Sequence, residues 1–176
     1  TKVQALSVQI IILLLSSSWA SSVSSNTTIP DSSLTPNISV QADSSGATLR
    51  FGGDCLLAGH YEEAVGDSVG HAFAGFDLLR SADVAMVNLE CPITVRGSRV
   101  SKPYNFRMHP RFIPALLSAG IDAVTVANNH IYDYGRIGLF DTISYLDSVG
   151  IRHVGAGRTA LEAHMPAIFR KNGIRI

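Results

Sequence analysis

Cysteine is scarce in this sequence, with Cys55 and Cys91 as the two examples in 176 residues. A metal site built from thiolates needs more cysteines than this. The two thiols follow the ends of neighbouring predicted strands, so they either pair in an oxidising compartment or fill space in the core. Side chains alternate between the faces of a strand, which turns each cysteine away from the face of the preceding residue. We therefore predict two small buried residues.

An excess of charge is also absent, because 14 Lys and Arg residues balance 14 Asp and Glu residues. With no net field over the whole chain, we do not expect nucleic acid as a partner. The charges are unevenly placed, because no acidic residue occurs between Glu90 and Asp122. This stretch would attract an anionic substrate, although a solvated basic loop explains it equally well. Its positive residues are Arg96, Arg99, Lys102, Arg107 and Arg111.

Apolar runs long enough to cross a bilayer are missing as well. The run at residues 8–15 is about eight residues long, whereas a spanning helix needs roughly 20. Lys2 precedes this run and small residues follow it up to Ala20, which is typical of a signal peptide. We predict a signal peptide at residues 1–20 and export to the extracellular space or cell envelope. The Ser- and Thr-rich residues 21–46 are predicted to form a disordered tether.

Residues 47–176 are long enough for one folded domain, and short apolar segments there alternate between strand-like and helix-like spacing. This alternation predicts an α/β fold with a mostly parallel sheet. The chain stops inside a predicted strand, so we expect a domain that is truncated at its C-terminus. The expected strands lie at residues 48–52, 84–89, 123–127 and 151–154, with helices at 71–79, 114–119 and 137–149, a short edge strand around Tyr104 and Phe106, and a hairpin around Asn172-Gly173.

Three of the predicted strands end in side chains that bind metals. The first runs into Asp54, the second into Glu90, and the third into Asn128-Asn129-His130. Because the carboxyl ends of parallel strands meet at one edge of a sheet, we expect these side chains to gather there. Such an oxygen-rich set suits a hard or borderline divalent cation such as Mn, Mg, Zn or Fe. Asn88 either supports Glu90 or bonds a neighbouring loop, and the sequence leaves both alternatives open.

Three motifs in series resemble the bacterial CapA family, the poly-γ-glutamate capsule-synthesis proteins related to metallophosphoesterases. They are Gly53-Asp54-Cys55-Leu56-Leu57, Asn88-Leu89-Glu90-Cys91-Pro92-Ile93, and Ala127-Asn128-Asn129-His130 with Asp133-Tyr134-Gly135. The resemblance covers roughly residues 48–176. It implies a four-layer α/β/β/α metallophosphoesterase-like domain, of which residues 47–176 would be the N-terminal part. Family members usually carry Arg at position 60 and an aliphatic residue at position 55, where this chain has His60 and Cys55.

The resemblance also implies roles for individual residues. Asp54 and Glu90 would be carboxylate ligands of the divalent metal, and Asn129 would be a neutral ligand. His130 would act as general acid or stabilise charge on the substrate oxygen. Asp133 would orient that imidazole.

Two functions of different classes follow from these observations. The first is an exported metal-dependent hydrolase or transferase of the metallophosphoesterase type in capsule or cell-envelope polymer biosynthesis. The second is a non-catalytic component that keeps the fold and binds or exports a polyanion. Either version acts on an anionic polymer or a phosphoester substrate, with a membrane-associated capsule synthesis complex as a further candidate partner. The expected substrate-binding residues are Arg99, Lys102, Tyr104 and Arg107.

Overall fold

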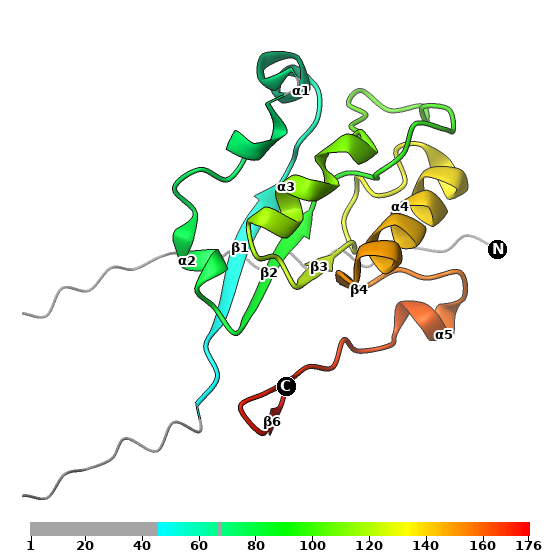
Figure 1. The fold of residues 1–176 in the computed structure, drawn as a ribbon. Coiled ribbons are helices and arrows are strands. Elements are labelled where there is room, and N and C mark those ends of the chain that lie inside the picture. The colour runs from blue at the N-terminus through cyan, green and yellow to red at the C-terminus, as the bar shows by residue number, and fades with distance from the viewer. Residues whose placement is uncertain (1–45, 67) are drawn as a thin grey trace, which may run out of the picture.

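The computed structural model describes residues 46–66 and 68–176, and its centre is a parallel sheet (Figure 1). The predicted signal peptide and all but the last residue of the predicted tether lie outside the described residues. The strands are arranged in the order β1-β2-β3-β4 and every neighbouring pair is parallel, which confirms the predicted α/β class. Their bounds are β1 Leu49–Cys55, β2 Val84–Leu89, β3 Ala123–Thr125 and β4 Arg152–Val154.

The strand order follows the chain order, and this places the connecting helices on one face of the sheet. Right-handed crossovers that always step in the same direction put every helix on the same side. In Figure 1, α3 and α4 lie in front of the strands. Alternate strand residues such as Val87, Leu89 and Val124 are buried. The helices are α1 His60–Val65, α2 Asp77–Arg80, α3 Ile113–Ser118, α4 Gly135–Val149 and α5 Ala160–Ala163, with 3-10 turns at Val69–His71 and Pro110–Phe112.

An irregularity in β1 sets the register at the end of the sheet. The pairing of β1 with β2 shifts between Phe51 and Asp54, so that Asp54 lies beside Asn88. Gly52 and Gly53 occupy this shift, and a Cβ atom on Gly52 would lie 3.0 Å from the side chain of Val87. A glycine at this position therefore permits the close approach of the two strands.

Two predicted elements differ from the structure. The helix expected at residues 71–79 is interrupted, because Gly75 has a φ of 85° that no right-handed helix allows. The edge strand expected around Tyr104 and Phe106 is wrong, because the N–H of Phe106 donates to the side chain of Asp133 instead of to a neighbouring strand. Helix α1 was not predicted, and His60 at its start is exposed.

The C-terminal elements follow the sequence pattern closely. Helix α4 ends at Gly150, which takes the left-handed conformation with a φ of 76°. The strands β5 Arg170–Lys171 and β6 Ile174–Arg175 form the predicted hairpin. Asn172 and Gly173 both have positive φ values, as a two-residue hairpin turn requires.

Polar side chains on α4 hold the chain that leaves β2. Asp141 accepts hydrogen bonds from Thr94 Oγ1 at 2.6 Å and from Arg96 Nε at 3.0 Å. The hydrogen bond from Arg96 holds the pKa of the Asp141 carboxyl below its usual value, together with the bond from Thr94. This part of the loop is therefore fixed to the helix that follows the third strand.

Across residues 46–66 and 68–176, no helix has the length and apolar character needed to cross a membrane.

Both cysteines are buried and unpaired, as the alternation along the strands predicted. Burial raises the pKa of the Cys55 thiol to about 12, and burial also raises the pKa of Cys91. The thiolate is the form that reacts with alkylating and disulfide reagents.

We expect both thiols to resist a disulfide reagent in the native protein at pH 8. With a pKa about four units above this pH, the thiolate fraction of Cys55 is on the order of one in ten thousand. Each protein thiol that reacts releases one thiol from the reagent, and this release can be followed over time. It should be almost absent in buffer and should reach two per protein in denaturant. Fast modification of one thiol in folded protein would contradict the buried placement.

Candidate metal and anion site

The carboxyl ends of β1 and β2 bring two carboxylates to one edge of the sheet. Asp54 lies near the end of β1 and is exposed, and its register partner is Asn88 on β2. Glu90 follows β2 directly, is half-buried, and donates its backbone N–H to the carbonyl of Cys55 at 3.1 Å. The two acidic side chains therefore come from adjacent strands, as the order of the predicted strands led us to expect.

The side-chain amide of Asn88 joins these carboxylates. Its Nδ2 donates to Asp54 Oδ1 at 2.8 Å and also to Glu90 Oε2. The sequence left two alternatives open for Asn88, and the structure shows both: its amide supports Glu90, and its Oδ1 bonds Asn128 in the loop that follows β3. A neutral donor shared by two like charges offsets part of their repulsion.

Asn128 fixes the direction of the Asn88 amide. Its Oδ1 accepts the backbone N–H groups of His130 at 3.0 Å and Ile131 at 2.9 Å, so its amino group must face the other way. That amino group donates to Asn88 Oδ1 at 3.0 Å and to the carbonyl of Leu89 at 2.8 Å. Asn88 can then present only N–H groups to the carboxylates. We call this chain of bonds, from the Asn128 loop through Asn88 to Asp54 and Glu90, the amide relay.

Asn129, the predicted neutral metal ligand, lies differently from its neighbour. Its side chain is exposed, and its backbone carbonyl accepts a hydrogen bond from Lys102 Nζ at 2.8 Å. Its role as a ligand stays a prediction. Sequence analysis included Asn128 in the strand-end set, and the resemblance assigned the ligand role to Asn129. It missed that Asn128 orients Asn88, and no local pattern signals that contact.

The imidazole of His130 lies against a buried acid. Asp133 is fully buried, and its Oδ2 lies 2.8 Å from His130 Nδ1 and accepts the N–H of Phe106 at 2.6 Å. Lys102 forms an ion pair with Asp133, and its Nζ is 3.2 Å from His130 Nδ1. The ring of Phe106 packs on the imidazole with centroids 4.6 Å apart. A carboxylate accepts, so the tautomer with its proton on Nδ1 faces Asp133, and that tautomer has an Nε2 that can accept a hydrogen bond or bind a ligand.

The donors at this edge fit a cation that prefers oxygen. Among residues 46–66 and 68–176, no group of three or more His, Cys, Asp or Glu side chains is placed to hold a metal. The amide relay, however, uses one oxygen of each carboxylate, and no contact within the described part of the chain occupies Asp54 Oδ2 or Glu90 Oε1. One or two carboxylates with water and substrate completing the shell is the usual arrangement for Mg²⁺.

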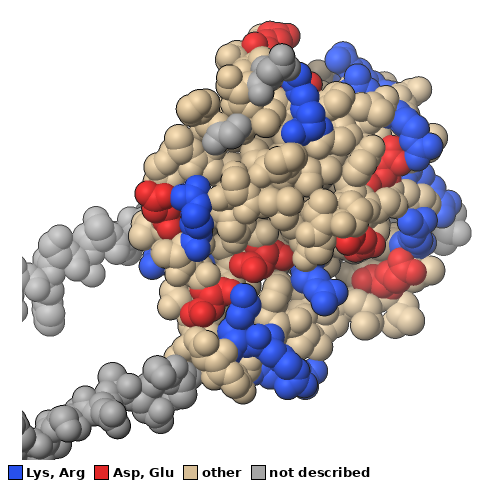
Figure 2. Space-filling model, viewed as in Figure 1, with Lys and Arg blue, Asp and Glu red and all other residues tan. Residues whose placement is uncertain are grey.

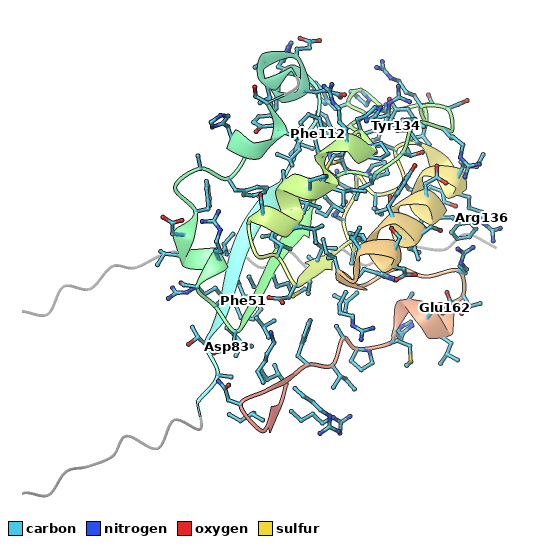
Figure 3. The ribbon with its side chains drawn as sticks, viewed as in Figure 1. Phe51, Asp83, Phe112, Tyr134, Arg136 and Glu162 are labelled. Atoms are coloured by element: carbon cyan, nitrogen blue, oxygen red, sulfur yellow. The ribbon has the colours of Figure 1, made fainter. Side chains whose placement is uncertain are left out.

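The predicted substrate-binding residues divide into two groups. Lys102 is paired with Asp133 inside the loop, and Tyr104 points outward with 72% of its surface exposed. Arg99 and Arg107 instead meet at Tyr134, a buried residue next to Asp133 that is labelled in Figure 3. In Figure 2, Lys and Arg side chains gather at the upper right, where Figure 1 places the loop before α3 and the start of α4.

A cavity of about 550 Å³ lies away from the edge that carries Asp54 and Glu90. It is formed by α4, β4 and the chain that follows α5. Its polar lining includes Arg158 and His153, whose Nε2 is 3.3 Å from Asp147. Hydrophobic side chains such as Ile143 and Ile168 also line it. None of the predicted metal or catalytic residues contributes to this cavity.

Residues 48–176 match the family model of the bacterial capsule synthesis protein PGA_cap. The chain belongs to this family. The match begins just before β1 and includes both carboxylates, the Asn128 loop and His130. It agrees with the resemblance found in the three motifs.

Individual relatives carry names that point the same way. The chain is 43% identical over 89 residues to the "Probable polyglutamine synthesis accessory protein" of Mycobacterium tuberculosis, covering 50% of this chain and 23% of that protein. It is 26% identical to the "Capsule biosynthesis protein CapA" of Bacillus anthracis, over 73% of this chain and 33% of the relative. It is 27% identical to the "PGA biosynthesis protein CapA" of Bacillus subtilis, over 81% of this chain and 38% of the relative. The chain thus spans well under half the length of these relatives.

The amide relay can be tested with two neighbouring substitutions. Asn128→Asp keeps the acceptor for the backbone N–H groups but loses the amino group, which leaves a carboxylate oxygen facing the carbonyls of Asn88 and Leu89. We expect the free energy of unfolding to fall by about 1–3 kcal/mol. Asn129→Asp makes the same chemical change on an exposed side chain and should cost less than about 0.5 kcal/mol. Urea unfolding measures both, and equal losses would show that Asn128 has no special place.

Proposed function

We propose that this protein acts in the biosynthesis of an anionic capsule or cell-envelope polymer of the poly-γ-glutamate type, with a divalent cation held by Asp54 and Glu90. The observation that carries the proposal is the amide relay, which places two carboxylates from adjacent strands beside the His130 loop. Family membership and the names of the Bacillus relatives support the choice of polymer. The reaction would be a hydrolysis or transfer of the metallophosphoesterase type, on the polymer or on a phosphoester.

The protein side chains near the cation would divide the remaining work. When bound, Mn, Mg, Zn or Fe would polarise the substrate and lower the pKa of a bound water. His130 would present Nε2 to the substrate and protonate the leaving oxygen, because its Nδ1 is engaged by Asp133. Lys102 and the N–H of Phe106 would hold Asp133 in place. Asn129 is a further proposed ligand and would need to turn toward the carboxylates.

One face of the sheet keeps exposed apolar side chains when the described residues are considered, and this supports the four-layer arrangement as part of the proposal. Phe51 on β1 is 60% exposed, is labelled in Figure 3, and pairs in register with the half-buried Met86. Leu49 on the same strand is 40% exposed. Parallel sheets are almost always covered on both faces, whereas here the helices lie on one. We propose that a second sheet packs on the Phe51 face, which makes an α/β/β/α domain.

Export is the remaining part of the proposal. The predicted signal peptide at residues 1–20 would direct the protein to the extracellular space or the cell envelope. A capsule polymer is assembled at the cell surface, so a membrane-associated synthesis complex is the partner we propose.

The alternative function is polyanion binding without catalysis. It is favoured by Arg99 and Arg107, which make no ion pair with a carboxylate in the described part of the chain. Binding of this kind weakens strongly with added salt, because exposed charges are screened over about 8–10 Å at physiological ionic strength. Salt-insensitive binding would argue against the alternative.

Substitution of Asp54 tests the metal site in the full-length protein. We expect Asp54→Asn to weaken Mn²⁺ binding at least about 100-fold in titration calorimetry and to abolish the thermal shift that Mn²⁺ produces, since one of two carboxylate ligands is lost. Any metal-dependent turnover should disappear with it. Glu63→Gln is the matched control, because Glu63 is exposed and its side chain bonds His60 alone among the described residues. Unchanged affinity in Asp54→Asn would remove the site from this edge.

A further inference from the structure

A small cavity of about 210 Å³ lies between the start of α1 and the loop that carries the basic residues. Its lining includes Arg99, Asn105, Arg107 and Tyr134. Clefts that enclose a drug-sized ligand measure roughly 300–1,000 Å³, so this one suits a single small group and not a length of polymer.

Two guanidinium groups converge on one aromatic ring at this cavity. Arg99 Nε donates to the hydroxyl of Tyr134 at 3.2 Å, and Arg107 Cζ lies 4.8 Å from the centre of the same ring. Tyr134 is 6% exposed, so the ring gives both cations a fixed support. Two like charges on one support repel each other and would be stabilised by an anion between them.

These two arginines differ from the other basic residues of the same stretch. The rest are already neutralised by acids within the described residues, in the pairs Arg96–Asp141, Lys102–Asp133 and Arg111–Glu62. The stretch therefore does not act as a uniformly basic loop. Its unpaired charge is concentrated at the cavity.

Asn105 adds a second kind of recognition. Its Nδ2 donates to the carbonyls of Val100 at 3.2 Å and Lys102 at 3.0 Å, which fixes the direction of the amide. Its Oδ1 is buried and accepts no hydrogen bond from the described residues. A buried acceptor without a donor is costly, and a ligand N–H would satisfy it.

We propose that this cavity binds one glutamyl unit of a γ-linked polymer, with Arg99 and Arg107 holding its carboxylate and Asn105 Oδ1 accepting its amide N–H. In a γ-linked chain the free carboxylate and the amide nitrogen are attached to the same carbon, so one unit supplies both groups at short range. Sulfate, which carries no proton at neutral pH, offers the charge without a donor. The assignment rests on the proposed function, because it names the substrate contact of that same site.

The cavity is connected to the His130 site through Phe106. This residue lies between Asn105 and Arg107 in the chain, packs on the imidazole of His130, and donates its N–H to Asp133. A unit bound in the cavity would therefore hold the polymer next to the catalytic imidazole. The reacting bond would lie on a neighbouring unit.

One acidic residue opposes anion binding and gives a test in the opposite direction. Glu62 lines the cavity, and its Oε1 is 3.6 Å from Arg111 Nη2. A substitution that removes the negative charge of Glu62 should strengthen binding of a carboxylate, because the repulsion between the two like charges is lost.

The experiment measures binding of a γ-linked glutamate oligomer to the full-length protein by titration calorimetry at fixed ionic strength, without added metal. We expect Arg99→Gln/Arg107→Gln to bind about tenfold or more weakly and Glu62→Gln to bind more tightly. The matched control is Arg136→Gln/Arg158→Gln, which removes two arginines that share the ring of Phe140 outside the cavity. A neutral γ-linked oligomer whose free α-carboxylates are replaced by carboxamides, and an oligomer with methylated amide nitrogens, should both bind more weakly than the parent.

The outcomes separate this assignment from the function on which it rests. Equal losses in the two double arginine variants, with an intact wild-type interaction, would overturn the cavity assignment and leave the proposed function standing. Sulfate competing as well as the oligomer, or full binding of the methylated oligomer, would overturn the part played by Asn105. If the wild-type protein binds no oligomer at all, the proposed polymer is wrong as well. If the arginine variants fold poorly, the Glu62→Gln variant still tests the assignment. Unchanged affinity in Glu62→Gln would overturn it.

Discussion

The two backbone hydrogen bonds to Asn128 Oδ1 are the constraint on which the site depends. They set the direction of one side-chain amide, and every later contact toward the carboxylates follows from that direction. Asp54 and Glu90 are brought together by strand order, but like charges at the end of a sheet do not remain in contact without a donor between them. The amide relay supplies that donor. It also ties the loop that carries His130 to the strands that carry the acids.

The second constraint is the burial of Asp133. An ionised carboxylate removed from water must be paired and hydrogen-bonded, and this one is contacted by Lys102, His130 and the N–H of Phe106. Its own backbone carbonyl accepts the N–H of Val100 at 2.9 Å. The basic loop is thereby held around a single residue. This explains why Lys102 is directed inward while Arg99 and Arg107 reach the cavity.

Much of the fold could be predicted because it depends on local pattern. The continuous apolar run of β2 and the helical spacing of α4 before Gly150 both appeared where the sequence indicated them. The expected helix at residues 71–79 failed because a short helix and a turn can reproduce helical spacing, and Gly75 breaks the segment between them. The carboxylate pair was predictable from strand ends alone. The choice between Asn128 and Asn129, and the ion pair of Lys102, depend on loop conformation and partners distant in the chain, which no local pattern contains.

The strictly sequential strand order has a consequence for how the protein is assembled during synthesis. Among the described strands, each of β2, β3 and β4 joins the outer edge of those before it, so none of the four has to enter between earlier ones. As the chain emerges from its N-terminus, Asp54 and Glu90 are complete before Asn128, which orients their shared donor, has been made. Until that loop arrives, the acids repel each other and the edge has no fixed geometry. The order in which residues are added therefore delays the defined geometry of this sheet edge until three of the four described strands are in place.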